Sequence, residues 1–198
     1  MTGNPIDVKR SEPRERLLRT ASGLFYSKGI RAVGVEEVLA EAGVTRATLY
    51  RHFSGKDDLI ATYLRTAHQS MREQVDSVRG DDKSAEEQIR SVARLIGEQI
   101  TSAGFRGCAF LNAAAEYPEK QSPAHQAVLE HRAWFLDTMT VLFEQARAPE
   151  PTPAAQHFVM LRDGAMAAGC LSEPQDVADV LFRGVDGLLK KMGSAASK

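Results

Sequence analysis

The sequence contains little cysteine, and its two cysteines are far apart. Cys108 and Cys170 are separated by 62 positions in a chain of 198 residues, and neither belongs to a Cys-x-x-Cys or Cys/His ligand spacing. Such a pair does not provide the ligand pattern of a structural zinc site, so we expect two reduced thiols. We therefore predict no bound metal and no cofactor.

The sequence also lacks the common motifs of catalysis. It contains no glycine-rich phosphate loop, no serine nucleophile elbow and no His-Glu-x-x-His pattern. His125 and His131 are six positions apart, which places them on different faces of a helix and makes a shared metal ion unfavourable. These absences argue against an enzyme.

Long apolar runs and strand patterns are missing as well. No run is long enough to cross a bilayer, and the N-terminus has no signal-peptide core. Hydrophobic residues make up 43% of the chain, which is sufficient for a substantial core in one or two domains. We predict a cytoplasmic, all-α protein without a membrane partner, whose residues 1–10 are disordered.

The net charge is close to zero but unevenly distributed. At −1 overall, the chain does not have the profile of a protein that coats nucleic acid nonspecifically. Residues 1–56 contain 10 Lys and Arg against 6 Asp and Glu, whereas residues 57–198 contain 15 against 20. A basic N-terminal region in a chain of nearly zero net charge favours salt-dependent DNA binding by that region.

The same basic region contains the breaks of a helix-turn-helix. Residues 35–42 place Val35, Val38, Leu39 and Ala42 on one helical face, and Gly43 supplies the left-handed conformation for a sharp exit. Thr45 is a favoured N-cap residue. The pattern predicts a second, short helix from about residue 46 to residue 52.

The second helix of this motif is polar on its outer side. Leu49 and Phe53, four positions apart, give it an apolar face that packs on the first helix. The outward residues, all but one of them able to form hydrogen bonds, are Arg46, Ala47, Thr48, Tyr50, Arg51 and His52. This set suits DNA. Arg46 can read a guanine with two hydrogen bonds or bind a phosphate, and the sequence leaves both open.

A third helix is predicted to begin directly after the motif. Ser54 suits its N-cap and Asp57 its N3 position, where an acid is favourable. Lys56 lies in the first turn, where its charge opposes the helix dipole. A neighbouring anion such as a phosphate would offset this, and the alternative is an ordinary surface lysine.

Three segments resemble the N-terminal domain of TetR/AcrR-type transcriptional regulators. They are Arg16-Leu-Leu-Arg-Thr-Ala-Ser-Gly-Leu-Phe-Tyr-Ser-Lys-Gly29, Ala42-Gly-Val-Thr-Arg-Ala-Thr-Leu-Tyr-Arg-His-Phe53 and Gly55-Lys-Asp-Asp-Leu59. The resemblance covers roughly residues 14–64. It implies that phosphates are held by Thr45, Tyr50, His52 and Lys56, and that base edges are faced by Arg46, Ala47 and Thr48.

The chain departs from the pattern of this family in the first helix of the motif. Val35 and Leu39 stand where family members often have Thr and Ala, and Glu36 and Glu37 replace polar or basic residues. The resemblance therefore does not extend to DNA contacts from the first helix. We expect the second helix to carry recognition.

The rest of the chain is predicted to form further helices. Helical spacing of apolar residues indicates helices over about 13–28, 55–78, 84–101, 108–117, 123–147, 154–170 and 173–192, with a proline-rich loop at 148–153. With the two helices of the motif this gives about nine. The helix at 123–147 is apolar around so much of its circumference that it should be nearly central.

The last two helices are candidates for a homodimer interface. They offer small residues for close approach and a broad apolar surface, and the predicted interface residues are Gly164, Ala168, Val180, Leu181, Gly184, Val185 and Leu188. The alternative is that both helices only close the core of the monomer. The family resemblance implies a four-helix bundle made by two subunits, which would present two recognition helices to a two-fold operator.

The middle of the chain is the candidate site for a small-molecule effector. Helix breakers, small residues and isolated polar groups around 104–117 tolerate a cavity, and the predicted lining is Phe105, Cys108, Phe110, Asn112, Glu116, Trp134 and Met139. Ordinary core packing is the alternative for each of them. An effector site in this region is implied by the family resemblance.

The sequence thus predicts a DNA-binding domain at 11–56 and a ligand-binding and dimerisation domain at 57–198. The expected function is a ligand-responsive transcriptional regulator, a repressor released from a palindromic double-stranded DNA operator by a small molecule. A transcriptional activator of the same fold and a helical interaction module that does not bind DNA are the alternatives.

Overall fold

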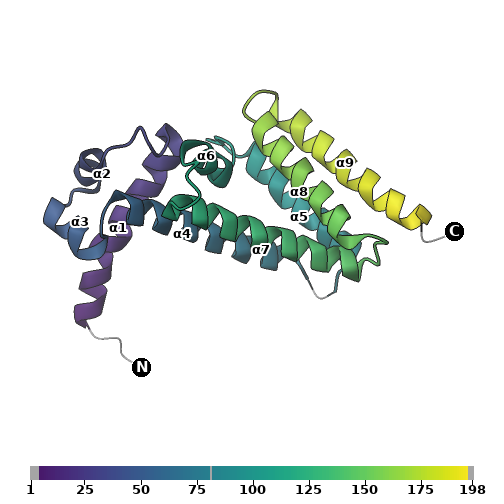
Figure 1. Ribbon diagram of the computed structural model, residues 1–198, viewed down its shortest axis with the longest axis horizontal. Coiled ribbons are helices and arrows are strands. Elements are labelled where there is room, and N and C mark those ends of the chain that lie inside the picture. Colours follow the sequence, from purple (N-terminus) through teal and green to yellow (C-terminus); the bar gives the residue numbers. More distant parts are fainter. Residues whose placement is uncertain (1–4, 81, 196–198) are drawn as a thin grey trace. The chain divides into compact units, whose positions relative to one another are not determined.

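The computed structural model describes residues 5–80 and 82–195. This part of the chain consists of helices joined by turns and loops, and it contains no strand (Figure 1). Its nine helices are α1 (Pro5–Lys28), α2 (Val35–Ala42), α3 (Arg46–His52), α4 (Lys56–Val78), α5 (Ala85–Thr101), α6 (Ala109–Glu116), α7 (Pro123–Gln145), α8 (Pro151–Ala168) and α9 (Pro174–Ala195). The predicted fold class is confirmed.

The chain forms two compact units whose boundary differs from the predicted one at residue 56. The first unit runs to Ala67 and also includes Asn112–Val128, and the second comprises His68–Leu111 and the chain from Leu129 onward. Three helices, α4, α6 and α7, therefore contribute residues to both units. Local patterns could not show this, because the segment 112–128 joins the first unit through contacts distant in sequence.

Helix α1 starts earlier than the sequence suggested. It begins at Pro5 and contains Pro13, where a start was predicted after a disordered lead of ten residues. A proline inside a helix removes one backbone hydrogen bond, and the Lys, Arg and Glu residues around it favour helix. The first four residues of the predicted lead lie outside the described part of the chain.

The helix-turn-helix has the predicted boundaries. Val38, Leu39 and Ala42 of α2 are buried, and Gly43 ends the helix in the left-handed conformation with φ 61°. Residues 17, 21 and 25 of α1 are buried beside them. α1 thus forms the base on which α2 and α3 pack.

The start of α4 corrects the predicted capping. The backbone N–H of Leu59 donates to the carbonyl of Gly55, which makes Gly55 the N-cap and Asp58 the N3 residue. The carboxylate of Asp58 accepts a hydrogen bond from the backbone N–H of Ser54 at 2.9 Å. Ser54 and Asp57 were each assigned one position too early.

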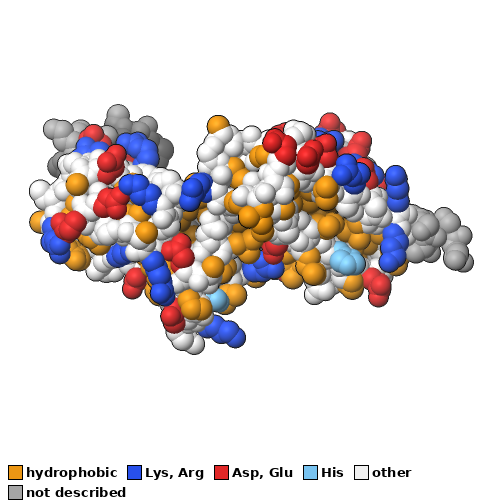
Figure 2. Space-filling model, turned by 90° about the horizontal axis from the view of Figure 1, so that it is seen from above, with side chains coloured by type: hydrophobic (Ala, Val, Ile, Leu, Met, Phe, Trp, Pro, Cys, Tyr) orange, Lys and Arg blue, Asp and Glu red, His pale blue; other side chains and the backbone are white. Residues whose placement is uncertain are grey.

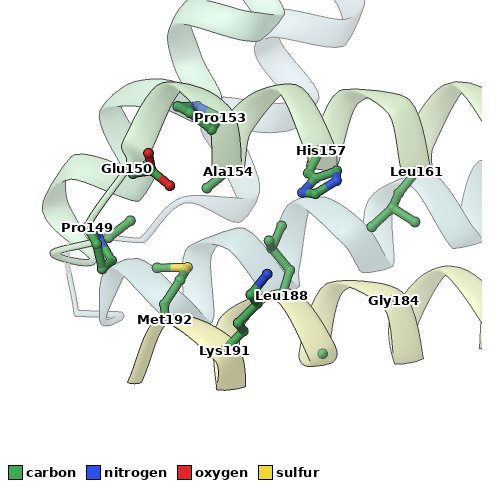
Figure 3. Close-up of a pocket in the computed structure, with 12 residues that line it drawn as sticks. Pro149, Glu150, Pro153, Ala154, His157, Leu161, Gly184, Leu188, Lys191 and Met192 are labelled. Carbon is green, nitrogen blue, oxygen red and sulfur yellow. The ribbon is translucent and has the colours of Figure 1, made fainter. Parts of the chain in front are cut away.

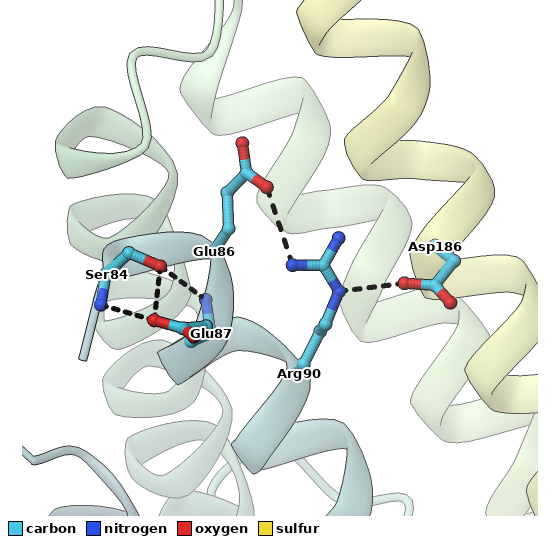
Figure 4. Close-up of polar contacts among 5 residues, drawn as sticks. All are labelled: Ser84, Glu86, Glu87, Arg90 and Asp186. Carbon is cyan, nitrogen blue, oxygen red and sulfur yellow. Dashed lines mark hydrogen bonds and ion pairs between the residues drawn. The ribbon is translucent and has the colours of Figure 1, made fainter.

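Helices α5, α8 and α9 pack side by side in the second unit (Figure 1). The N-cap Ser84 forms a capping box with Glu87, and Arg90 of α5 donates to Asp186 of α9 at 2.9 Å and also pairs with Glu86 (Figure 4). The two helices approach closely, since a Cβ atom on Gly97 would lie 2.6 Å from the ring of Phe182.

Two predictions about the outer surface of the second unit are wrong. Leu181 and Val185, assigned to a dimer interface, are 2% and 1% exposed and belong to the core of one subunit. Helix α7, predicted to be nearly central, has a solvent-facing side on which Leu129 and Val141 are each 43% exposed. Periodicity identifies an apolar face without showing whether the same chain or another covers it.

Helix α8 begins inside the predicted proline-rich loop. Pro151 is its first residue, because the first turn of a helix needs no N–H donors and the fixed φ of proline suits it. Because α7 also ends earlier than predicted, at Gln145, the connection shifts to residues 146–150 and keeps nearly its predicted length.

Within residues 5–80 and 82–195, no helix is long and apolar enough to cross a membrane. Nor does this part of the chain bring three or more His, Cys, Asp or Glu side chains together in a group that could hold a metal ion. Cys108 is buried, Cys170 is exposed, and both are free thiols.

Candidate nucleic-acid interface

The N-terminus of α3 is fixed by its cap. The side chain of Thr45 accepts a hydrogen bond from the backbone N–H of Thr48 at 3.2 Å, and the two hydroxyl groups lie 3.0 Å apart. One of the helix's unpaired N–H groups is thereby satisfied. The cap sets the direction of the helix and of its outward side chains.

The apolar side of α3 is fully buried. Leu49 is 0% and Phe53 2% exposed, and the guanidinium of Arg14 lies over the ring of Phe53 at 5.3 Å from its centroid. This anchoring prevents α3 from rotating about its axis. The polar side of the helix must therefore face away from the core of the unit.

The structure separates the predicted DNA-contacting residues into two groups. The residues it leaves exposed are Thr45, Arg46, Ala47, Tyr50 and Arg51. Thr48, His52 and Lys56 are half-buried. Tyr50 is 53% exposed, a large aromatic side chain facing solvent beside two arginines. The exposed group thus consists of the N-cap and four residues of α3, and its contact with DNA stays a prediction.

Lys56 has an anionic neighbour within the protein. Partial burial lowers the pKa of its ammonium group, while the carboxylate of Glu116 counteracts this effect. The sequence indicated that an anion near Lys56 would offset its position at the start of a helix. Glu116 is one such anion, and a DNA phosphate at Lys56 stays a prediction.

Glu116 also holds the turn between α1 and α2. Its carboxylate accepts hydrogen bonds from the backbone N–H groups of Ile30 at 3.1 Å and Arg31 at 2.6 Å. The turn begins at Gly29, whose φ of 94° is strained for any other residue. Glu116 was predicted to line an effector site, and in the structure it serves the DNA-binding unit.

A second contact reinforces this attachment. The guanidinium of Arg31 lies 5.3 Å from the centroid of the Tyr117 ring and 3.7 Å from the carboxylate of Glu119. The segment after α6 thus binds the α1–α2 turn through backbone and side chain. The partners are about 86 positions apart in sequence, which is why no local pattern revealed them.

The two acids at the start of α2 form separate ion pairs. Glu36 pairs with Arg46, the first residue of α3. Glu37 pairs with Lys28 of α1 at 2.6 Å and raises the pKa of that lysine. Each acid therefore joins α2 to a different helix, and only one of them contacts the predicted DNA-reading surface.

The other predicted effector residues are divided between the units. Asn112 is exposed in the first unit. In the second, Met139 is fully buried, Phe105 packs near Gly169, and Phe110 stacks on His131 with ring centroids 3.5 Å apart. The predicted effector residues thus belong to both units, and their shared role as an effector site stays a prediction.

His131 is the centre of an aromatic cluster that sequence reasoning missed. Its Nδ1 lies 3.2 Å from Nδ1 of His68, and Trp134 packs against both rings. Burial lowers the pKa of His131 to about 3, assisted by the positive charges of Arg162 and neighbouring groups. The imidazole is therefore neutral at physiological pH.

A buried arginine adjoins this cluster. Arg162, 5% exposed, donates to Cys108 Sγ at 3.1 Å and to Asp163 at 2.8 Å, and Asp163 also pairs with Arg132 at 2.6 Å. Burial opposes its charge, but Cys108 and Asp163 hold the pKa of Arg162 above its ordinary value. Of the predicted effector residues, Cys108, Phe110 and Trp134 belong to this region.

Comparison with known proteins identifies the class of protein that this fold and helix-turn-helix define. The sequence model of the family described as "Bacterial regulatory proteins, tetR family" matches residues 17–63. The crystal structure of SCO4454, a TetR-family transcriptional regulator from Streptomyces coelicolor, is 55% identical and covers 92% of this chain and 96% of that one, with a TM-score of 0.89. The chain belongs to the TetR family of transcriptional regulators and contains its DNA-binding helix-turn-helix.

Two curated relatives match over only a part of the chain. The transcriptional activator FasR of Mycolicibacterium smegmatis is 40% identical over 58 residues, 29% of this chain and 26% of the relative. The transcriptional repressor KstR2 of Rhodococcus jostii is 36% identical over 67 residues, 33% of each chain. The matched segment thus spans about a third or less of these relatives.

Proposed function

We propose that the protein is a homodimeric repressor that binds a palindromic operator and is released from it by a small molecule. The main support for this proposal is that α3 has a polar, exposed outer face, while its opposite, apolar side is buried. A short, rigid helix with arginine, threonine and tyrosine side chains outward suits the major groove.

Roles within this face follow from exposure and chemistry. Arg46 and Ala47 are exposed in the first turn of α3 and Thr48 is half-buried, and we assign these three residues to base edges. Thr45, Tyr50, Arg51, His52 and Lys56 offer hydroxyl, guanidinium, imidazole and ammonium groups for phosphates. Phosphate contacts set the register, and base contacts select the sequence.

The operator test uses DNA selected from a random pool by the wild-type protein. The variant Tyr50→Ala/Lys56→Ala should lose operator binding while keeping its helicity and oligomeric state, because it loses two phosphate contacts per subunit. Lys190→Ala, which removes an exposed lysine on α9, is the matched control and should bind normally. Retained affinity in the double variant would overturn the phosphate assignment, and absence of any selected DNA would favour the interaction module.

Dimerisation is supported by the outward side of α8 and α9. Met160 is 69% and Val180 57% exposed on this side, and Gly164 leaves space above the helix. Figure 2 looks onto the side that is uppermost in Figure 1 and shows hydrophobic side chains gathered on this half of the molecule. A monomer would leave these side chains in water.

A groove of about 460 Å³ lies between α8 and α9 on the second unit. Leu161 and His157 from α8 and Gly184 and Leu188 from α9 line it, with Lys191 at its edge (Figure 3). Of the predicted interface residues, Gly184 and Leu188 border this groove, whereas Gly164 and Ala168 lie further along α8. Helices of a second subunit would cover these small residues closely.

For the effector we favour the region around His131 and Arg162. It combines aromatic rings with a buried cation, which is a suitable composition for binding an organic molecule. Phe110 of this region and Glu116, which accepts hydrogen bonds from the α1–α2 turn, both lie on α6, so α6 connects the proposed effector region to the DNA-binding unit along the chain. A thermal-shift screen, followed by release of selected DNA, tests this role.

Activation is a second candidate, because the relative FasR is named an activator and KstR2 a repressor. A reporter gene behind the selected operator distinguishes them. Repression predicts higher expression when the regulator is deleted, and activation predicts lower expression.

A further inference from the structure

We propose that Glu36 is a positioning residue for DNA recognition, which directs Arg46 toward a base edge and away from the phosphates. This inference rests on the proposed reading of DNA by α3. Glu36 lies in the first turn of α2 and forms an ion pair with Arg46, the first residue of α3. The pair therefore joins the two helices at the turn where the predicted base contacts begin.

Arg46 has a long, flexible side chain and two competing uses on DNA. Its guanidinium can donate two hydrogen bonds to guanine or can pair with a phosphate, and only the first use carries sequence information. The phosphates are numerous and strongly negative. Without a constraint, an arginine at this exposed position gains affinity for any DNA.

Glu36 provides that constraint. The carboxylate occupies one side of the guanidinium and repels phosphates from the same place, so that the remaining N–H groups are available to a base. Glu36 thus contributes to specificity partly by disfavouring the contact between Arg46 and a phosphate. It also explains why an acid is compatible with the first turn of α2, where the helix dipole stabilises it.

The ion pair between Glu36 and Arg46 is too exposed to hold the arginine side chain in a single conformation. The side chains of Arg46 and Glu36 are 60% and 68% exposed, and ion pairs of this kind are weak. Glu36 can bias the arginine only modestly. We expect its removal to change discrimination by about three- to fivefold at one base pair per half-site, not to abolish binding.

Glu37 offers a matched control in the same turn of the same helix. It carries the same charge, and its partner is Lys28 of α1, outside the predicted DNA-reading surface. Glu36→Gln and Glu37→Gln therefore remove equal charge from nearly the same place. A difference between them reports the contact with Arg46 and not the change in net charge.

The experiment measures binding of each variant to the selected operator and to its single-base-pair substitutions, over a series of salt concentrations. Glu36→Gln should bind unrelated DNA more tightly, with a salt slope steeper by about 0.9 for each phosphate newly contacted by Arg46. It should also lose the three- to fivefold discrimination at one position. Glu36→Asp should restore part of this discrimination. In an Arg46→Ala background, Glu36→Gln should cause no further change in DNA affinity or discrimination.

The outcomes separate this inference from the proposed function. Equal changes in Glu36→Gln and Glu37→Gln, or an unchanged discrimination profile in Glu36→Gln, would overturn the role of Glu36 and leave DNA recognition by α3 intact. Wild-type protein without any sequence preference would overturn both.

Discussion

At the residue scale, the least expected side chain is His131. No role was predicted for this histidine, yet its ring stacks on Phe110, packs against Trp134 and lies beside His68. Burial among these rings and beside Arg162 disfavours its protonated form. Protonation of the imidazole therefore destabilises the folded state.

The neutral state of His131 predicts how stability depends on pH. Its pKa is about 3 in the folded protein and near 6.5 when unfolded, so between these values the unfolded chain binds the additional proton. The contribution is fully present above about pH 6.5 and is lost as the pH falls. The expected slope from this residue is about 1.4 kcal/mol per pH unit.

Urea unfolding at pH 7.5 and at pH 5.5, at one protein concentration, measures this effect. Replacement by His131→Phe keeps an aromatic ring next to Phe110 and removes the titrating group, so its free energy of unfolding should change less between the two pH values. His68, whose pKa burial also lowers, still titrates in the variant. Equal slopes in the two proteins would show that His131 is not responsible.

At the element scale, the sequence predicted helices whose limits are set by local chemistry. Both limits of α3 follow from Thr45 and from the spacing of Leu49 and Phe53, and the end of α2 follows from Gly43. The predictions from sequence failed where contacts between residues distant in sequence determine burial and hydrogen bonding. Leu181 and Val185 are buried on α9, which packs against α5 and α8 of the same subunit, and Glu116 finds its partners on a turn distant in sequence.

The bond between Glu116 and the α1–α2 turn leads to a prediction at this scale. Glu116→Ala leaves the buried N–H of Ile30 and the N–H of Arg31 without their acceptor, which should cost about 1–3 kcal/mol. Urea unfolding measures the loss, and hydrogen exchange should accelerate at these two amides. Glu119→Ala is the control, because its 3.7 Å surface pair with Arg31 should contribute under about 1 kcal/mol.

The comparison of Glu116→Ala with Glu119→Ala also tests how the end of α6 is attached to the α1–α2 turn. If the turn is held by the carboxylate, Glu116→Gln should keep one of the two acceptor oxygens and show an intermediate loss. Losses of equal size in Glu116→Ala and Glu119→Ala would mean that the segment is held by packing instead.

At the scale of the whole molecule, large apolar side chains are exposed on two surfaces of the second unit. Val180 and Met160 on α9 and α8 and Val141 and Leu129 on α7 are all substantially exposed. Two surfaces thus compete for the role of subunit interface. The proposed dimer uses the first, where Gly164 and the groove beside Gly184 allow helices to approach closely.

The variants Val180→Asp and Val141→Asp distinguish these surfaces, since they place the same charge on residues of similar exposure. In a two-fold interface each substitution occurs twice, so Val180→Asp should weaken dimerisation by at least ~100-fold. Sedimentation analysis should then show monomers with unchanged helicity, and operator affinity should fall because one subunit reads only half a palindrome. Val141→Asp should remain dimeric. Dissociation by Val141→Asp alone would assign the interface to α7 and leave the face of α8 and α9 without this role.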